Sequence, residues 1–128
     1  MQAQTSPSGA AAIALGALFG ALAVGLGAFA AHAMKAHYDA DQLHTFETGV
    51  RYQMYHALAL VGCGALQRTG ARTKVATLLF VIGIVLFSGS LYGLVWTQAR
   101  WLGPITPIGG VAFVAGWIAL LIAARRRP

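Results

Sequence analysis

The chain has 128 residues, of which 58% are hydrophobic and only 9% are Asp, Glu, Lys or Arg. Ordinary soluble domains carry about 25% charged residues, and a domain this short exposes too much surface to hide so many apolar side chains. The composition therefore excludes a water-soluble enzyme, a nucleic-acid-binding domain despite the net charge of +6, and a disordered chain. It predicts an integral membrane protein.

Long uncharged segments predict four membrane-spanning helices. A spanning helix needs about 20 mostly apolar residues, within a range of about 17–25. We expect spans at residues 9–33, 52–67, 75–96 and 107–124. The second is short, so its helix is expected to begin near Asp41 and to emerge from the bilayer. The predicted fold class is an all-α integral membrane protein, in which a single domain (residues 1–128) forms an antiparallel bundle of four transmembrane helices.

Residues 9–33 are expected to stay as a helix that packs closely on a neighbour. No basic residue precedes this segment, and its apolar run exceeds the about 7–15 residues of a secretory signal. Gly16 and Gly20 lie four residues apart, as do Gly89 and Gly93 in the third span, and small residues at this spacing let helices approach closely in lipid. Both pairs predict helix packing within the chain, with contact between copies of the chain as the less favoured use.

The segment from Asp39 to Gln67 brings polar side chains into the second span. On a helix, Tyr52, Tyr55 and His56 fall on one stripe, which should face the bundle interior because hydroxyl and imidazole groups find no partners in lipid. Helical rise places polar residues of the third span at a similar depth. The sequence therefore predicts one polar layer in the outer half of the bundle. Its expected members are Tyr52, Tyr55, His56, Ser88, Ser90 and Tyr92.

His56 is the ionisable side chain nearest the middle of the membrane, and two interpretations are open. It could form a proton or ligand site, since histidine titrates near neutral pH, or it could be a neutral imidazole bonded to a Tyr or Ser of a neighbouring helix. We favour the second, because no Asp or Glu accompanies it inside the membrane. His32 lies at a different depth, which disfavours a shared haem. We expect no catalytic site, cofactor or metal site.

Basic residues predict the orientation of the bundle. With four spans, the N-terminus, the loop after the second span and the C-terminus share one side, which carries six basic residues and no acidic one. The other side carries three of each. The excess of Lys and Arg predicts that both termini are cytoplasmic, and we expect contact with anionic lipid headgroups there and no binding of nucleic acid. The six basic residues are Arg68, Arg72, Lys74, Arg125, Arg126 and Arg127.

The loop before the fourth span carries signals of a membrane interface and of a helix start. Trp96 and Trp101 flank it and are expected to anchor the protein at the outer interface. Thr106 followed by Pro107 predicts an N-cap with proline at the first helical position, where its missing N–H costs nothing.

Four stretches of the chain are familiar in this order. They are Gly27-Ala28-Phe29-Ala30-Ala31-His32-Ala33-Met34, residues 46–58, residues 86–92, and residues 103–110 followed by Gly116-Trp117. Over about residues 10 to 120 the chain resembles the YgdD/YwdK family of small membrane proteins of unknown function, with Ala30 where the family's motif has glycine. The resemblance implies a four-helix bundle in a bacterial plasma (inner) membrane and no established activity. It adds His32, Gln53, Thr106 and Pro107 to the signature positions, and His32 and Gln53 thereby join the candidate polar cluster.

Two functions are compatible with the sequence. The preferred hypothesis is a non-enzymatic accessory protein that packs against a larger membrane complex, against lipids or against a second copy of itself. The alternative is a small-molecule or proton-handling membrane protein that uses the polar layer around His56. The alternative predicts a wet cavity at His56, whereas a dry and fully packed His56 would argue against it.

Overall fold

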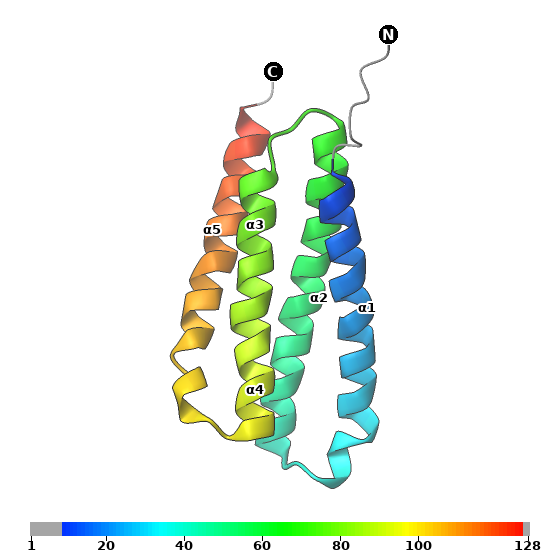
Figure 1. The fold of residues 1–128 in the computed structure, drawn as a ribbon, viewed down its shortest axis with the longest axis vertical. Coiled ribbons are helices and arrows are strands. Elements are labelled where there is room, and N and C mark those ends of the chain that lie inside the picture. Colours follow the sequence, from blue (N-terminus) through cyan, green and yellow to red (C-terminus); the bar gives the residue numbers. More distant parts are fainter. Residues whose placement is uncertain (1–8, 127–128) are drawn as a thin grey trace.

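The computed structural model describes residues 9–126 as helices joined by short turns (Figure 1). The α1 helix, the α2 helix, a composite rod made of α3, η2 and α4, and the α5 helix run alternately in opposite directions, so that α1 begins at the end of the molecule where α5 ends (Figure 1). The elements are α1 (Ala10–His32), η1 (Met34–Ala36), α2 (Ala40–Arg68), α3 (Lys74–Gly83), η2 (Ile84–Ser88), α4 (Gly89–Thr97), η3 (Arg100–Leu102) and α5 (Ile105–Arg125).

The start of α2 is defined by a reciprocal cap. The Asp39 side chain accepts a hydrogen bond from the backbone N–H of Gln42 at 2.8 Å, and the Gln42 side chain accepts one from the N–H of Asp39 at 3.0 Å. This capping box satisfies two N–H groups that have no partner within the helix. It starts α2 at Ala40, one residue from the predicted position, so the helix extends well beyond the uncharged segment.

Two local features of the later helices differ from the predictions. The α5 helix begins at Ile105, so Thr106 lies inside the helix instead of capping it, and Pro107 lies in the first turn, where a missing N–H still leaves no hydrogen bond unmade. The third predicted span contains the π-helical segment η2, in which the N–H of Gly89 bonds to the carbonyl of Ile84, five residues earlier. Neither feature follows from residue spacing along a single helix.

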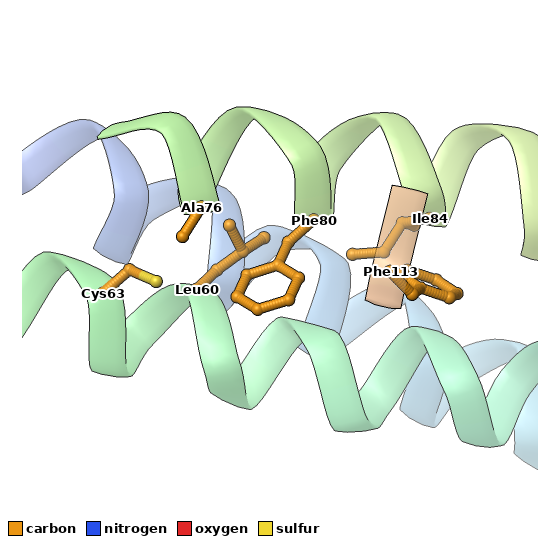
Figure 2. Packing of buried hydrophobic residues seen from close by; sticks show 6 residues of the cluster. All are labelled: Leu60, Cys63, Ala76, Phe80, Ile84 and Phe113. Carbon is orange, nitrogen blue, oxygen red and sulfur yellow. The ribbon is translucent and has the colours of Figure 1, made fainter. Parts of the chain in front are cut away.

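Buried apolar side chains form two clusters at different heights in the bundle. The cluster in Figure 2 joins α2 to α3, η2 and α5, with Phe80 and Ile84 pointing toward α2. Its buried members are Leu60, Cys63, Ala76, Phe80, Ile84 and Phe113. The second cluster lies toward the turn between α1 and α2 and contains Ala30, Met34, Phe46, Tyr92 and Val95. The two clusters hold α2 between its neighbours along most of its length.

Gly16 allows a close approach between the middle parts of α1 and α2. A Cβ atom at Gly16 would lie 2.6 Å from the carbonyl oxygen of Ala57 and 2.9 Å from the backbone nitrogen of Val61. Gly20 faces the same helix at ordinary distance, since its Cβ would lie 3.9 Å from the Ala57 side chain. A residue larger than glycine at position 16 would therefore disrupt this contact.

The second predicted glycine pair does not pack helices together within the described part of this chain. No atom lies within 4 Å of a Cβ placed on Gly89, and a Cβ on Gly93 would meet only the side chain of Leu102, in the turn η3. The close approach on this side of the bundle is made instead by Gly109 of α5, which lies against the backbone of Phe87 in η2. The prediction for Gly89 and Gly93 is wrong because their side of α4 faces away from the neighbouring helices.

The outer surface of the helices is strongly apolar. Among the described residues, three helical segments are long and apolar enough to cross a membrane: Ala10–Ala36, Lys74–Thr97 and Arg100–Arg125. Only 17% of the most apolar window in the first of these is buried, so most of its apolar side chains need a surrounding other than water. The α2 helix is not in this group, because charged and polar side chains continue from its start to His56 in the middle of the helix.

Candidate functional site

His56 is buried on α2 and makes a hydrogen bond with each of its ring nitrogens. Its Nδ1 lies 2.6 Å from the carbonyl oxygen of Tyr52, and its Nε2 lies 3.1 Å from the indole Nε1 of Trp117 on α5. A carbonyl only accepts and an indole N–H only donates, so Nδ1 carries the proton and Nε2 accepts from Trp117. These two bonds therefore require a neutral imidazole in a single tautomer.

Aromatic rings surround the imidazole of His56. The Phe113 ring stacks on it with centroids 3.6 Å apart and planes inclined by 9°, and the Phe80 ring packs against it with centroids 5.5 Å apart. The residue is only 4% exposed. His56 thus forms a dry contact between α2 and α5. This arrangement fits the structural interpretation of His56, although the side chain that bonds to it is Trp117 and not a Tyr or Ser.

Trp117 and Phe113 are the parts of this contact that sequence reasoning missed. Trp117 lies in one of the stretches that carry the family resemblance, and this was the only signal that could have pointed to it. Its role depends on α5 lying beside α2 at the level of His56, and residue spacing within a single helix does not reveal which helices are neighbours.

Gln53 forms a second buried contact, which joins three helices. Its side-chain N–H donates to the carbonyl oxygen of Phe19 on α1 at 2.8 Å, and its side-chain oxygen accepts from the Tyr92 hydroxyl on α4 at 2.7 Å. Gln53 is 3% exposed. A polar residue at this position can stay inside the bundle because a partner satisfies both ends of its amide.

Two serines of the composite rod form further contacts between helices. The Ser88 hydroxyl donates to the carbonyl oxygen of Gly49 on α2 at 2.6 Å. The hydroxyl oxygens of Ser90 and Thr106 lie 2.6 Å apart, which joins α4 to α5 near the start of α5. Together with the Gln53 contact, these bonds connect α2, α4 and α5 without any charged group.

The side chains of three residues of the predicted cluster make none of these hydrogen bonds. Tyr52 and Tyr55 are 40% and 54% exposed. The Tyr52 ring lies at the edge of the His56 contact, with its centroid 4.7 Å from that of Phe87 and 6.3 Å from that of His56. His32 is exposed at the end of α1, where its Nδ1 lies 2.8 Å from the carbonyl oxygen of Ala28 in its own helix. The prediction of one interior layer is therefore wrong: His32 and Tyr55 are exposed, and Tyr52 lies at the edge of the His56 contact. The remaining members form separate contacts along different helix interfaces.

The buried face of α2 is rotated by about a quarter of a turn from the predicted stripe, at 100° per residue. Gly49, Gln53 and Ala57 lie on the buried face, whereas the two tyrosines lie at its edge or outside it. The cause is the close approach of α1, which packs where α2 has small residues and not where it has hydroxyl groups. Tyrosine tolerates the edge because its ring is apolar and its hydroxyl can reach toward the membrane interface.

The remaining predicted residues lie near the ends of the bundle. Trp96 and Trp101 are 46% and 69% exposed, at the end of the molecule that holds the turn between α4 and α5. Glu47 and Arg51 form the exposed ion pair that their spacing allows, at 4.0 Å. Within residues 9–126 no group of three or more His, Cys, Asp or Glu side chains is placed to hold a metal ion.

The buried polar side chains of the described bundle are fully paired in hydrogen bonds. Every buried side-chain nitrogen or oxygen in residues 9–126 has a hydrogen-bond partner. Breaking one of these bonds would leave a buried polar group unpaired. The hydrogen bonds of Gln53, His56, Ser88 and Ser90 described above join one helix to another.

Comparison with known proteins identifies the family to which the chain belongs. Residues 26–110 match the family described as "Protein of unknown function (DUF423)". UPF0382 membrane proteins of Staphylococcus aureus (strain bovine RF122 / ET3-1) and Staphylococcus haemolyticus (strain JCSC1435) are 49% and 46% identical over 112 residues, which cover 87% of this chain and 92% of each relative. The UPF0382 membrane protein YwdK of Bacillus subtilis (strain 168) is 49% identical over 116 residues, 88% of this chain and 94% of its own.

No solved structure matches the chain. The apolar helices and the membrane-protein relatives agree that this is a multi-pass bacterial membrane protein. The chain therefore belongs to the DUF423 family, the YwdK-type membrane proteins of unknown function.

Proposed function

We propose that the protein is a non-enzymatic bundle of four membrane spans, with both termini cytoplasmic, that packs laterally against a larger membrane complex. Support for α2 as the fourth span comes from its position. It lies between α1 and the composite rod and runs alongside both (Figure 1). Its uncharged part begins after Arg51, whose side chain is 58% exposed and can extend to the interface.

The orientation is supported by the distribution of charge. The basic residues of the turn between α2 and α3 and of the end of α5 lie at one end of the bundle, and Asp39, Asp41 and Glu47 lie toward the other. Because short basic loops stay on the cytoplasmic side, the end with the turn between α2 and α3 is assigned to the cytoplasm.

Cysteine labelling tests both the span count and the orientation. In a Cys63→Ala background, we expect Ala36→Cys and Thr97→Cys to react with a membrane-impermeant maleimide added to intact cells, and Arg72→Cys to react only after permeabilisation. The readout is the mass shift of the protein on a gel. Labelling of Ala36→Cys and Arg72→Cys from the same side would show that α2 does not cross.

A stripe of small residues on the outer face of α1 is the observation that carries the packing function. Ala17, Ala21, Gly25 and Ala28 are all exposed, and nothing lies within 4 Å of a Cβ on Gly25. In lipid, small residues at spacings of three and four mark the surface where a second helix packs. Gly16, on the opposite side of α1, already serves the contact with α2. The outer stripe is therefore assigned to a helix outside this chain.

A pull-down with a matched pair of variants tests this role. We expect tagged protein purified from mild detergent to retain a partner membrane protein, identified by mass spectrometry, and the Gly25→Leu variant to lose it. Gly62→Leu is the control, because Gly62 on α2 is also exposed and also has no atom within 4 Å of its Cβ position. Equal retention by both variants, or purification of the wild type without a partner, would refute the packing role of α1.

The proton-handling alternative receives less support. It requires a wet cavity at His56, and this side chain is 4% exposed, with both nitrogens bonded and Phe113 stacked on the ring. A proton on Nε2 would face the indole N–H of Trp117, donor against donor. The contacts of His56 suit a structural role better than a transport role.

A further inference from the structure

A groove lies at the end of the bundle that holds the basic residues, between the turn from α2 to α3 and the last turns of α5. Its volume is about 1020 Å³, at the upper end of the range of small-molecule sites. The groove is lined by the turn residues 69–72, by Val75 of α3, by three residues of α5 and by the residue that follows this helix. The last four are Ala119, Ile122, Ala123 and Arg126. No contact described above uses this groove.

Small and apolar residues shape the interior of the groove. Ala119 and Ala123 lie four residues apart on α5 and leave space opposite the turn, where Gly70 adopts a φ of 95° that suits glycine. Val75 and Ile122 are 64% and 44% exposed, so the groove continues onto the apolar outer surface of α3 and α5. A ligand of this groove therefore has an apolar part that can remain in the lipid.

The charged residues of the groove are all basic. Arg72 and Arg126 line it, and Lys74 and Arg125 lie close by in the sequence. The three carboxylate side chains of the chain are Asp39, Asp41 and Glu47. Even the nearest of them along α2, Glu47, lies about 30 Å from the end of this helix at 1.5 Å per residue. The two arginines thus have no acidic side chain to neutralise them, and a planar guanidinium matches a phosphate in two hydrogen bonds.

We infer that this groove binds one anionic phospholipid, with the headgroup phosphate between Arg72 and Arg126 and an acyl chain along Val75 and Ile122. The apolar continuation of the groove selects a lipid over a free phosphate. The site rests on the proposed function, because it requires the basic end to lie at the cytoplasmic headgroup layer. The lipid site lies on α3 and α5, at the end of the bundle opposite Trp96 and Trp101. It is separate from the face of α1 that is proposed to contact another protein.

Native mass spectrometry of delipidated protein in detergent tests the site. We expect one phosphatidylglycerol to bind at least about tenfold more tightly than phosphatidylcholine with the same acyl chains, since hydrogen bonds to charged groups are worth about one factor of ten or more. The Arg72→Gln/Arg126→Gln variant should bind both lipids equally. The Lys74→Gln/Arg125→Gln variant has the same net charge but leaves the lining intact, so it should keep the preference. Ala123→Leu should lose it, because the leucine fills the groove.

Three results would overturn the inference. If both double variants lost the preference for phosphatidylglycerol equally, the preference would come from the overall positive charge of this end and not from a defined site. If the wild type bound both lipids equally, there would be no site for an anionic headgroup. Displacement of phosphatidylglycerol by millimolar inorganic phosphate would show a site for a soluble anion. The outcome is separable from that of the proposed function, because Arg72→Gln/Arg126→Gln leaves the outer stripe of α1 intact and should still retain the partner protein in the pull-down.

Discussion

Replacing His56 by alanine is expected to lower the free energy of unfolding by about 2–4 kcal/mol, through the cavity that it leaves and the loss of the acceptor for Trp117. The Phe113 ring would lose its stacking partner, and the Trp117 N–H would lose its bond. The measurement is reversible unfolding in mixed detergent micelles, followed by tryptophan fluorescence. An effect on stability of this size would identify His56 as part of the scaffold that joins α2 to α5.

Trp117→Phe is the matched control for the His56 contact. It removes the indole donor but keeps an aromatic ring against Phe80, so only the hydrogen bond and part of the packing are lost. Hydrogen bonds between membrane helices average about 0.6 kcal/mol, so we expect a loss of about 1 kcal/mol. If His56→Ala left stability unchanged, the described packing would be wrong and the proton-handling alternative would regain support.

Replacing Gly16 by leucine is expected to separate α1 from α2 and to cost at least about 3 kcal/mol, the upper end of the usual cost of overpacking. The new side chain would meet backbone atoms of Ala57 and Val61, which cannot rotate away as a side chain can. The same unfolding assay measures the effect, and protease sensitivity of the turn between α1 and α2 would report the separation independently.

Gly25→Leu supplies the internal control for the Gly16 variant. It places the same substitution on the same helix, at a position where no atom lies within 4 Å of the new Cβ. We expect its unfolding free energy to stay within about 0.5 kcal/mol of the wild type, as for most substitutions away from packed sites. Equal destabilisation by both variants would show that the contact with α2 does not explain the loss, because leucine favours a helix more than glycine does at either position.

The two glycine variants separate the two faces of α1. If the proposals hold, Gly16→Leu damages the bundle itself, and Gly25→Leu leaves a stable bundle that no longer binds its partner. On this proposal, α1 packs against α2 through Gly16 and against another protein through Gly25. The buried polar side chains of the described residues already have hydrogen-bond partners within the bundle. Its function then lies in what it holds together in the membrane.

Composition and local signals determined the membrane class, the helical character and most helix positions. In lipid, the backbone N–H and C=O groups of a segment of about 20 apolar residues must form hydrogen bonds with one another. The long uncharged segments therefore predict helices by themselves. The expected start of α2 near Asp41 lies within one residue of its observed start at Ala40. The family motifs likewise identified the membership that the comparisons show.

The tertiary structure decided which polar groups meet. Residue spacing placed Tyr52 and Tyr55 on one face with His56. In the assembled bundle, Gln53 is buried between α1 and α4, Tyr52 lies at the edge of the buried face, and Tyr55 is exposed. The bond between His56 and Trp117, the π-helical segment η2 and the groove beside Ala119 and Ala123 likewise depend on which helices are neighbours. In lipid, an apolar side chain gains little free energy by facing the bundle interior, because the surrounding acyl chains are equally apolar. The rotation of each helix is therefore set by how small residues fit between neighbouring helices, and this fit exists only in the assembled bundle.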